Sequence, residues 1–409
     1  MKKILTIVGA RPQIIKSSAI NRAIQRHFST QLQEVIVHTG QHYDANMSKV
    51  FFEEMSIPEP HYNLNVGSGS HGAMTAKMLE GLEKIYLIEQ PDAVLVYGDT
   101  NSTIAGALAA IKIHIPVIHV EAGLRSFNKA MPEEVNRIAC DHMSTLLFTP
   151  TKAGLKNLEK EGFNIHATGK ASANNPKVLL CGDIMFDNSL HFSELSELQS
   201  TLLKELSLNS DAYILVTIHR DSNTDVAENL QQIFSALLEI RESSGLKIVL
   251  PIHPRTKSKL EEQLPADLYA SLTADPGFMI IPPAGFLDII ALEKNAKMII
   301  TDSGGLQKEA FFFQKPCIIL RPQTEWVEIV ENGNAVLADA SAERIKTAFE
   351  ELSSKSNFTY PPLFGDGRGL VDLVAQYLAP GHAMDVPADM LAGEAYAGGL
   401  AVEGMDVVE

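Results

Sequence analysis

Short runs of apolar and β-branched residues alternate along this chain with longer segments whose apolar residues recur at helical spacing. Most of these runs are apolar at consecutive positions, which is typical of strands buried on both faces in a parallel sheet covered by helices. The runs fall into two groups. The first group lies at 3–9, 34–40, 93–99, 115–120 and 145–150, and the second at 213–219, 247–253, 279–283, 297–304 and 316–321.

The segments between these runs predict helices. In 225–244, for example, the apolar residues Val226, Leu230, Ile233, Leu237 and Ile240 fall on one helical face. Strands that alternate with helices in two blocks indicate an α/β fold, with two Rossmann-like, doubly wound domains.

A stretch without periodicity, around 165–190, separates the two blocks. We therefore expect an N-terminal domain at 1–175 and a C-terminal domain at 176–368. A short helix is expected at 369–381, where Pro380 and Gly381 end it. The remaining segment, 382–409, has six acidic residues and no Lys or Arg, so we expect a disordered tail.

Composition and charge exclude several classes of function. The 409 residues include 34 Lys and Arg against 50 Asp and Glu, a net charge of −16. A chain this acidic is a poor binder of nucleic acid or anionic membrane, so a phosphorylated ligand would need a local site. The three cysteines are far apart, which argues against a disulfide framework or a metal site. The short apolar run at 4–10 is followed directly by the charged Arg11 and has no cleavage-type segment, so it fits a strand better than a signal peptide, and we expect a cytoplasmic protein.

The first block carries a candidate phosphate site after its first strand. Gly9 opens a turn, and Arg11 and Lys16 follow at the start of the next predicted helix, where a phosphate is favoured. The segment matches neither the dinucleotide nor the Walker glycine pattern. The alternative is that both cations are ordinary surface charges.

Three connections in the first block each carry a carboxylate. Asp99 and Glu121 end strands, and Glu133 opens a helix behind Pro132. We expect the next residue, Glu134, on the solvent face of that helix. The alternative for Asp99 is a helix cap. Carboxylates converging on one site are what acid–base chemistry on a sugar requires.

The second block supplies cations and backbone donors at the ends of its strands. His219 and Arg220 follow one strand and His253 follows the next, with an ordinary exposed or buried histidine as the alternative for His253. The turn Ser303-Gly304-Gly305 opens a helix whose free N–H groups suit a diphosphate. Glu309 lies one to two turns into that helix, where it would accept from ribose hydroxyls or be a plain surface acid.

Together these residues predict a nucleotide sugar held in an interdomain cleft, with acids in the first domain and a diphosphate site in the second. A glycosyltransferase or a sugar-modifying enzyme would each use such a site. A nucleotide-sugar-binding regulatory protein is the non-enzyme alternative, and the presence of all three acids argues against it.

The combined motifs resemble the non-hydrolysing UDP-N-acetylglucosamine 2-epimerase family. They occur in the family's order over about residues 3 to 370. The motifs are GARPQIIK (9–16), HTGQHYDANM (38–47), VYGDTNST (96–103), HVEAGLRS (119–126), MPEEVNR (131–137), TIHRDSNTD (217–225), TDSGGLQKEA (301–310) and LRPQTEWVE (320–328).

This resemblance implies a glycosyltransferase-B-like arrangement of the two domains, with the final helix returning to the first. It also implies inversion at carbon 2 of a UDP-2-acetamido sugar, by elimination and re-addition of UDP, without a metal or other cofactor. A homodimer and a role in surface polysaccharide synthesis are expected from it as well. The roles carried over are acid–base catalysis for Asp99, Glu121 and Glu133, diphosphate contacts for Arg11, Lys16 and His219, diphosphate binding by Ser303, Gly304 and Gly305, and ribose binding by Glu309.

The sequence departs from the family's plain pattern at several motifs. Gln41-His42-Tyr43-Asp44 differs from the pattern of members activated by UDP-N-acetylglucosamine, so that regulation is not expected here. HRDSNTD and TEWVE differ from the forms of the plain enzyme. GARPQ, QHYD, RSFN and TEWVE resemble a subgroup acting on UDP-2,3-diacetamido-2,3-dideoxyglucuronate. A glycosyltransferase or a hydrolysing epimerase of the same architecture remains the alternative within enzymes.

Overall fold

The computed structural model describes residues 1–40, 58–367 and 406–407 of the chain. The expected helix at 369–381, the tail at 382–409 apart from residues 406–407, and the Gln41–Asp44 pattern lie outside the described residues. The chain forms two compact units, and the break between the larger part of unit 1 and unit 2 lies between Asn188 and Ser189.

Unit 1 contains a sheet whose described strands run in the order β14-β3-β2-β1-β4-β5-β6-β7. All neighbouring pairs are parallel except β14 with β3. The strands are β1 (Lys2–Val8), β2 (Leu32–His38), β3 (Tyr62–Asn63), β4 (Ala93–Tyr97), β5 (Val117–Val120), β6 (Leu146–Thr149), β7 (Lys177–Leu180) and β14 (Asp406–Val407). The helices are α1 (Arg11–Ala23) with the π-helical turn η1 (Ile24–Phe28), α3 (His71–Glu89), α4 (Asn101–Lys112), α5 (Pro132–Met143), α6 (Lys152–Lys160) and the start of α7 (Ile184–Gln199).

Unit 2 contains a second, fully parallel sheet in the order β10-β9-β8-β11-β12-β13. Its strands are β8 (Tyr213–Thr217), β9 (Lys247–Pro251), β10 (Phe278–Ile281), β11 (Met298–Thr301), β12 (Cys317–Ile319) and β13 (Ala335–Leu337). Its helices are α8 (Leu202–Glu205), α9 (Asp221–Thr224), α10 (Ala227–Ser244), α11 (Pro254–Gln263), α12 (Ala266–Ala274), α13 (Phe286–Asn295), α14 (Gly304–Phe312), α15 (Val327–Glu331) and α16 (Ala342–Ser354).

Both units have the doubly wound, Rossmann-like architecture that the strand pattern predicts. In each sheet the strand order reverses at one place, between β1 and β4 in unit 1 and between β8 and β11 in unit 2. Ligands of such sheets bind outside the carboxyl ends of the strands at this reversal. We therefore expect a ligand site at the turns that follow these four strands.

The first boundary lies further along the chain than the expected 175. β7 pairs in parallel with β6 through a register that includes Leu146 with Lys177, so the segment 177–180 extends the sheet of unit 1. β7 has the short sequence KVLL and follows an irregular stretch. The pattern of apolar residues therefore does not predict it as a strand. Unit 2 ends at Pro362.

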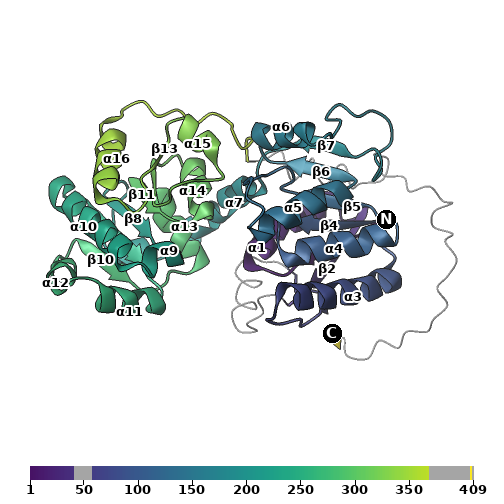
Figure 1. Cartoon of the computed structure of the whole chain (residues 1–409), viewed down its shortest axis with the longest axis horizontal. Helices are drawn as coiled ribbons and strands as arrows, with labels where there is room; N and C mark the ends of the chain where they lie inside the picture. The colour runs from purple at the N-terminus through teal and green to yellow at the C-terminus, as the bar shows by residue number, and fades with distance from the viewer. Residues whose placement is uncertain (41–57, 368–405, 408–409) are drawn as a thin grey trace. The chain divides into compact units, whose positions relative to one another are not determined.

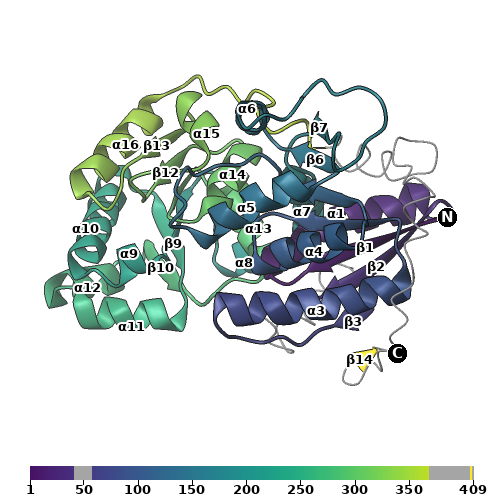
Figure 2. The same ribbon diagram turned by 45° about the vertical axis from the view of Figure 1, so that its right-hand side comes forward.

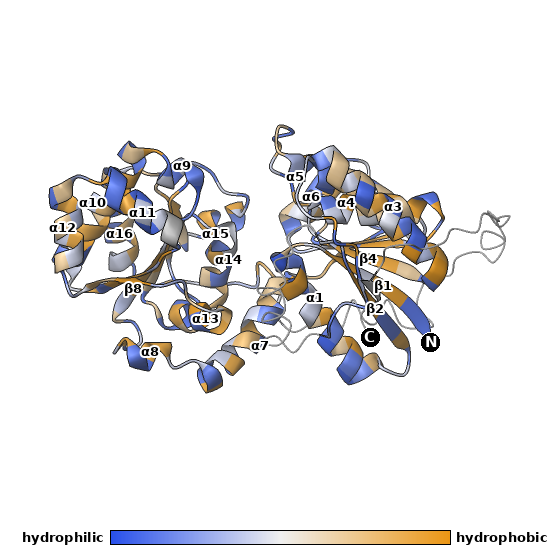
Figure 3. Ribbon diagram, turned by 90° about the horizontal axis from the view of Figure 1, so that it is seen from below, coloured by the Kyte–Doolittle hydropathy of each residue, from blue (hydrophilic) through white to orange (hydrophobic). Residues whose placement is uncertain are grey.

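In the central strands of unit 1, neighbouring residues pack against different helices. Ile4 of β1 packs in a cluster with Ile20 of α1, whereas the next residue, Leu5, packs in a cluster with Leu82 of α3. A strand with a helical layer on each side must be apolar on both faces. Figure 3 shows this as predominantly hydrophobic strands and helices of mixed character.

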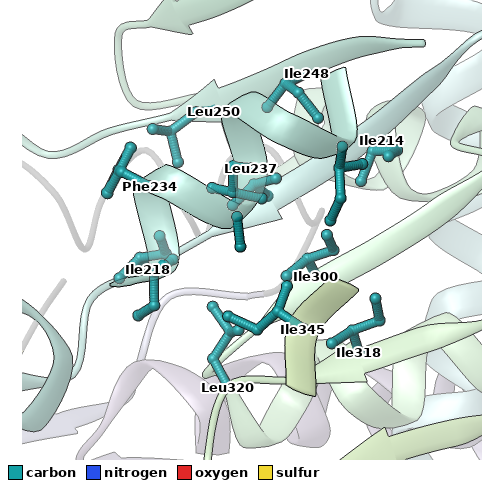
Figure 4. Packing of buried hydrophobic residues seen from close by; sticks show 14 of the residues in the cluster. Ile214, Ile218, Phe234, Leu237, Ile248, Leu250, Ile300, Ile318, Leu320 and Ile345 are labelled. Atoms are coloured by element: carbon teal, nitrogen blue, oxygen red, sulfur yellow. The ribbon is translucent and has the colours of Figure 1, made fainter. Parts of the chain in front are cut away.

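The core of unit 2 is built in the same way around one long helix. Phe234 and Leu237 of α10 are fully buried against Ile248 and Leu250 of β9 and Ile214 of β8 (Figure 4). Among the described residues, no helix combines the length and apolar character needed to cross a membrane.

We expect Phe234→Ala to lower the free energy of unfolding by about 3–5 kcal/mol, because a buried ring is replaced by a cavity. The matched control is Leu198→Ala, since the Leu198 side chain is 83% exposed and its loss should cost less than about 0.5 kcal/mol. Urea unfolding followed by circular dichroism measures both. Equal losses for the two variants would contradict this account of the core.

Candidate active site

The turns after β1 and β4 are joined by one buried side chain, Gln13. Its Oε1 accepts from the backbone N–H groups of Gly9 and Ala10 at 2.9 and 3.1 Å. Its Nε2 donates to the carbonyl of Tyr97 at 2.9 Å and to the Thr103 hydroxyl at 3.0 Å. The sequence gives no sign of this role, because a polar residue in the first turn of a helix is usually exposed.

The side chains of Thr39 and Ser102 lie so close to Gly9 that a side chain at this position would collide with them. A Cβ atom there would lie 2.0 Å from Ser102 Oγ and 2.2 Å from Thr39 Oγ1. These distances are far inside van der Waals contact. The glycine of the first motif is therefore required by packing, whatever ligand the turn meets.

Four charged side chains come together at this edge of unit 1. Lys16 of α1 forms an ion pair with Glu121, which follows β5. Arg137 of α5 donates from Nη2 to Asp99 Oδ2 at 2.5 Å. The charges of Lys16 and Glu121 are both close enough to Asp99 to shift the pKa of its carboxyl group. The structure thus brings Asp99, Glu121 and Lys16 together, as the sequence analysis expected for the two acids.

Asp99 combines partial exposure with a raised pKa. Its side chain is 32% exposed, so it can meet a ligand. Loss of water around the carboxyl group raises its pKa, and the Glu121 charge adds to the rise, against the opposing effects of Arg137 and Lys16. Thr100, and not Asp99, caps α4, because its hydroxyl accepts from the N–H of Thr103 at 3.4 Å. The cap alternative for Asp99 is therefore wrong.

Left-handed backbone shapes the turns that carry these acids. Gly98 has φ +62° and a Cβ there would lie 3.3 Å from Glu121 Oε2. Glu121 itself has φ 71°, a conformation that costs a non-glycine residue about 1–3 kcal/mol. Such strain persists only where surrounding contacts hold it, and it is concentrated at functional sites.

The expectation for Glu134 is wrong. Glu134 is buried rather than on the solvent face of α5. Its carboxylate accepts from the N–H groups of Ser126 and Phe127 at 2.8 and 2.9 Å, and it lies 3.2 Å from Arg137 Nη1. The preceding loop folds back over the helix start, which a helical pattern cannot show. Glu133 is exposed in the first turn of α5.

A buried carboxylate, Asp302, organises the corresponding edge of unit 2. It accepts from the N–H groups of His219 and Arg220 at 3.1 and 3.0 Å and from Asn223 Nδ2 at 3.1 Å. Its Oδ1 also lies 2.8 Å from His219 Nδ1. Burial opposes its charged form, but these partners outweigh burial and lower the pKa of Asp302. Asp302 is not among the candidate residues expected from the sequence.

The next residues form the N-terminus of α14. Ser303 caps the helix by accepting from Leu306 N, so Gly304 and Gly305 are its first two residues. Glu309 follows on the same helix and is partly exposed. Arg321 lies beside Gly304 and forms an ion pair with Glu325 at 2.9 Å. This edge combines a helix N-terminus with cations, which is an anion-binding arrangement.

Three further candidates are exposed. Arg11 is the first residue of α1, Arg220 directly follows His219, and His253 follows β9. Within 1–40 and 58–367, no group of three or more His, Cys, Asp or Glu side chains is arranged to hold a metal ion. Unit 1 thus gathers two carboxylates with Lys16 and Arg137, and unit 2 has a helix N-terminus with cationic side chains near it.

Comparison with known proteins places these features in a family. The family model described as UDP-N-acetylglucosamine 2-epimerase matches residues 22–375. A UDP-N-acetylglucosamine 2-epimerase homologue of Methanococcus maripaludis is 48% identical over 91% of this chain and 98% of its own. The UDP-2,3-diacetamido-2,3-dideoxy-D-glucuronate 2-epimerase of Pseudomonas aeruginosa is 45% identical over 92% of this chain and 99% of its own.

Solved structures agree with the sequence relatives. The Methanocaldococcus jannaschii UDP-GlcNAc 2-epimerase in complex with UDP-GlcNAc and UDP has a TM-score of 0.75 at 43% identity, covering 91% of this chain and 98% of its own. Phytolacca americana UGT2 has a TM-score of 0.55 at 12% identity, covering 95% of this chain and 98% of its own, a likeness of fold alone.

We expect Asp302→Asn to lower the free energy of unfolding by about 1–3 kcal/mol at neutral pH, because the buried donors around residue 302 lose their charged acceptor. The folded-state pKa of Asp302 is below its ordinary value of 3.8. Its contribution to stability is therefore complete above about pH 4 and lost as the pH falls below this value.

Urea unfolding of both proteins between pH 7 and pH 3 measures this difference. Asp267→Asn is the matched control, since Asp267 is exposed on α12 and its change should stay within about 0.5 kcal/mol throughout. A difference between Asp302→Asn and the unaltered protein that is the same at pH 7 and pH 3 would contradict the linkage.

Proposed function

The chain belongs to the UDP-N-acetylglucosamine 2-epimerase family, and from this we propose that it is an isomerase that inverts carbon 2 of a UDP-2-acetamido sugar. The observation that carries the proposal is the cluster of Asp99 and Glu121 with Lys16 and Arg137 at the carboxyl edge of the unit 1 sheet. A binding protein has no need of a carboxyl group with a raised pKa at this place.

The chemistry explains why such groups are needed. Carbon 2 of the sugar has no neighbouring carbonyl, so its proton is too weakly acidic for simple removal. In the proposed reaction a base takes the C2 proton while the bond from C1 to the diphosphate oxygen breaks, and a C1–C2 double bond forms. UDP then adds back to C1 as C2 receives a proton on the opposite face.

We assign the proton transfers to unit 1. Asp99 is the principal acid–base group, because its raised pKa and partial exposure suit a carboxyl group that must hold and release a proton. Glu121 is the second, with Lys16 holding its carboxylate in place. Glu133 remains a candidate on the strength of its motif, and its exposed position leaves it open to a ligand.

We assign the departing UDP to unit 2. The helix N-terminus at Ser303, Gly304 and Gly305 offers free N–H groups to a diphosphate whose charge grows as the C1–O bond breaks. His219, held by Asp302 but 58% exposed, and Arg220 are the neighbouring cationic candidates. Glu309 is assigned to the ribose, and Arg11 and His253 to further ligand contacts.

The substrate is UDP-N-acetylglucosamine or its 2,3-diacetamido-glucuronate analogue, since relatives named for each match nearly the whole chain. A role in surface polysaccharide synthesis is the use we propose for the product. The homodimer and the cytoplasmic location expected from the sequence stay predictions, and light scattering of the purified protein tests the first.

Incubation in D₂O with each of the two sugars tests the proposal. We expect deuterium at C2 of a UDP sugar that keeps its UDP, and a second epimer in the product. Release of UDP without an acceptor would identify a hydrolysing epimerase. Release only with an added acceptor would identify a glycosyltransferase. No exchange with either sugar would contradict the proposed reaction.

We expect Asp99→Asn to lower kcat by about 10²- to 10⁴-fold, because the amide cannot take up or release the C2 proton. The Kd for UDP should change less than about threefold, since an amide of the same shape preserves the site and loses under about 0.7 kcal/mol of binding. Glu80→Gln is the control, because Glu80 is exposed on α3 and pairs with Lys84 along the helix. Steady-state kinetics and calorimetry separate the two quantities, and an unchanged kcat would remove Asp99 from the mechanism.

A further inference from the structure

The geometry of unit 1 points to an additional positioning residue. We propose that His119 is a permanently protonated imidazolium which, together with Asp141, holds in place the two turns that carry Asp99 and Glu121. The inference rests on the proposed function for its catalytic consequence, and on geometry alone for the protonation state.

Both ring nitrogens of His119 face groups that only accept. Nε2 lies 2.7 Å from the carbonyl oxygen of Gly98, which has no proton to donate. Nδ1 lies 2.7 Å from Asp141 Oδ1. Asp141 acts as an acceptor on its other oxygen too, where the N–H of Gly123 donates at 3.1 Å and Arg125 Nη2 lies at 2.7 Å. A neutral imidazole has one N–H, so satisfying both contacts requires two.

The surrounding charges stabilise this protonated form. His119 and Asp141 are fully buried, and so is the side chain of Arg125. Arg125 also forms two hydrogen bonds with Glu161, at 2.7 and 2.6 Å. The network therefore has two cations and two carboxylates. Burial opposes the charge on the ring, but Cys140 and Asp141 outweigh burial and raise the pKa of His119 well above its usual range.

The network contacts the backbone on each side of the two acids. Gly98, whose carbonyl accepts from His119, immediately precedes Asp99. Gly123, whose N–H donates to Asp141, lies two residues after Glu121. The turns at Gly98, Glu121 and Gly123 are all left-handed, with φ 62°, 71° and 80°. One imidazolium–carboxylate pair thus contacts Gly98 and Gly123, the glycine turns beside the two proposed acid–base groups, and Glu121 is the strained residue between them.

This role differs from that of an ordinary buried ion pair, which contributes only to stability. An ordinary pair, when broken, lowers the melting temperature and leaves the turnover of the remaining folded enzyme unchanged. A positioning pair, when broken, lowers kcat in the folded enzyme, because displacement of a catalytic group by about 1 Å can cost about 10²-fold in rate. UDP binding, which we assign to unit 2, is the readout that should not change.

The protonation state is measured first, on the unaltered protein. With ¹⁵N-labelled histidine, one of the 13 histidines should keep both ring nitrogens protonated at a pH well above the ordinary histidine pKa of about 6.5. His119→Gln should remove that signal and His166→Gln, a change in an exposed loop, should leave it. Absence of such a histidine in the unaltered protein would overturn the proposal.

Kinetics then test the positioning role. His119→Gln and Asp141→Asn should each lower kcat about 10- to 100-fold with the Kd for UDP within about twofold, while His166→Gln matches the unaltered enzyme. Because the two residues act as one unit, the double variant should cost little more than the more damaging single variant. Additive losses, or an unchanged kcat in folded single variants, would overturn the proposal.

Failure of the inference is distinguishable from failure of the proposed function. If the unaltered protein exchanges no C2 proton, the proposed function fails, and the NMR signal still decides the protonation state. If His119→Gln does not fold, Asp141→Asn and the measurement on the unaltered protein still decide the inference. Melting temperature and UDP binding report whether each variant is folded.

Discussion

The strand order of each sheet reverses at a single place, and the chemistry of both units depends on that reversal. At the reversal, helices leave from opposite faces of the sheet, so the two turns that follow neighbouring strands separate and leave room for a ligand. In unit 1 these are the turns after β1 and β4, joined by Gln13. In unit 2 they are the turns after β8 and β11, joined by Asp302. One polar side chain at each reversal fixes the distance between turns that are far apart in sequence.

Buried charges at these edges are stable because each is fully compensated. Asp302 has its partners in the N–H groups and imidazole of one turn, and Asp141 has His119, Arg125 and Gly123. Removal of one member of such a set leaves a charge in a medium of low polarity, a cost that selects one arrangement over its alternatives. A fully compensated set of buried charges is also rigid. Acid–base groups need rigid surroundings, because their reactivity depends on position.

The sequence predicts the fold well, because burial of a strand on both faces leaves a local trace in consecutive apolar residues. Ile4 and Leu5, which are neighbours in β1, are both apolar and are buried in two different clusters. The boundary between the units was predicted less well, since β7 is short and its assignment depends on pairing with β6. The acids Asp99 and Glu121 could be found because they follow strands directly. Glu134 could not, because its burial depends on a loop that folds back from Ser126 and Phe127.

Two histidine–aspartate pairs show why residue type alone does not determine a role. His219 and Asp302 form one pair, and His119 and Asp141 the other, with Nδ1 of each ring 2.8 and 2.7 Å from a carboxylate oxygen. The His219 side chain is 58% exposed and can meet a ligand. His119 is fully enclosed, and its second nitrogen already donates to a carbonyl. The exposure of the side chain therefore distinguishes His219, which we propose to contact a ligand, from His119, which we propose to position the turns. The net charge of −16 is no obstacle to an anionic ligand, since a few cations at the strand ends act locally.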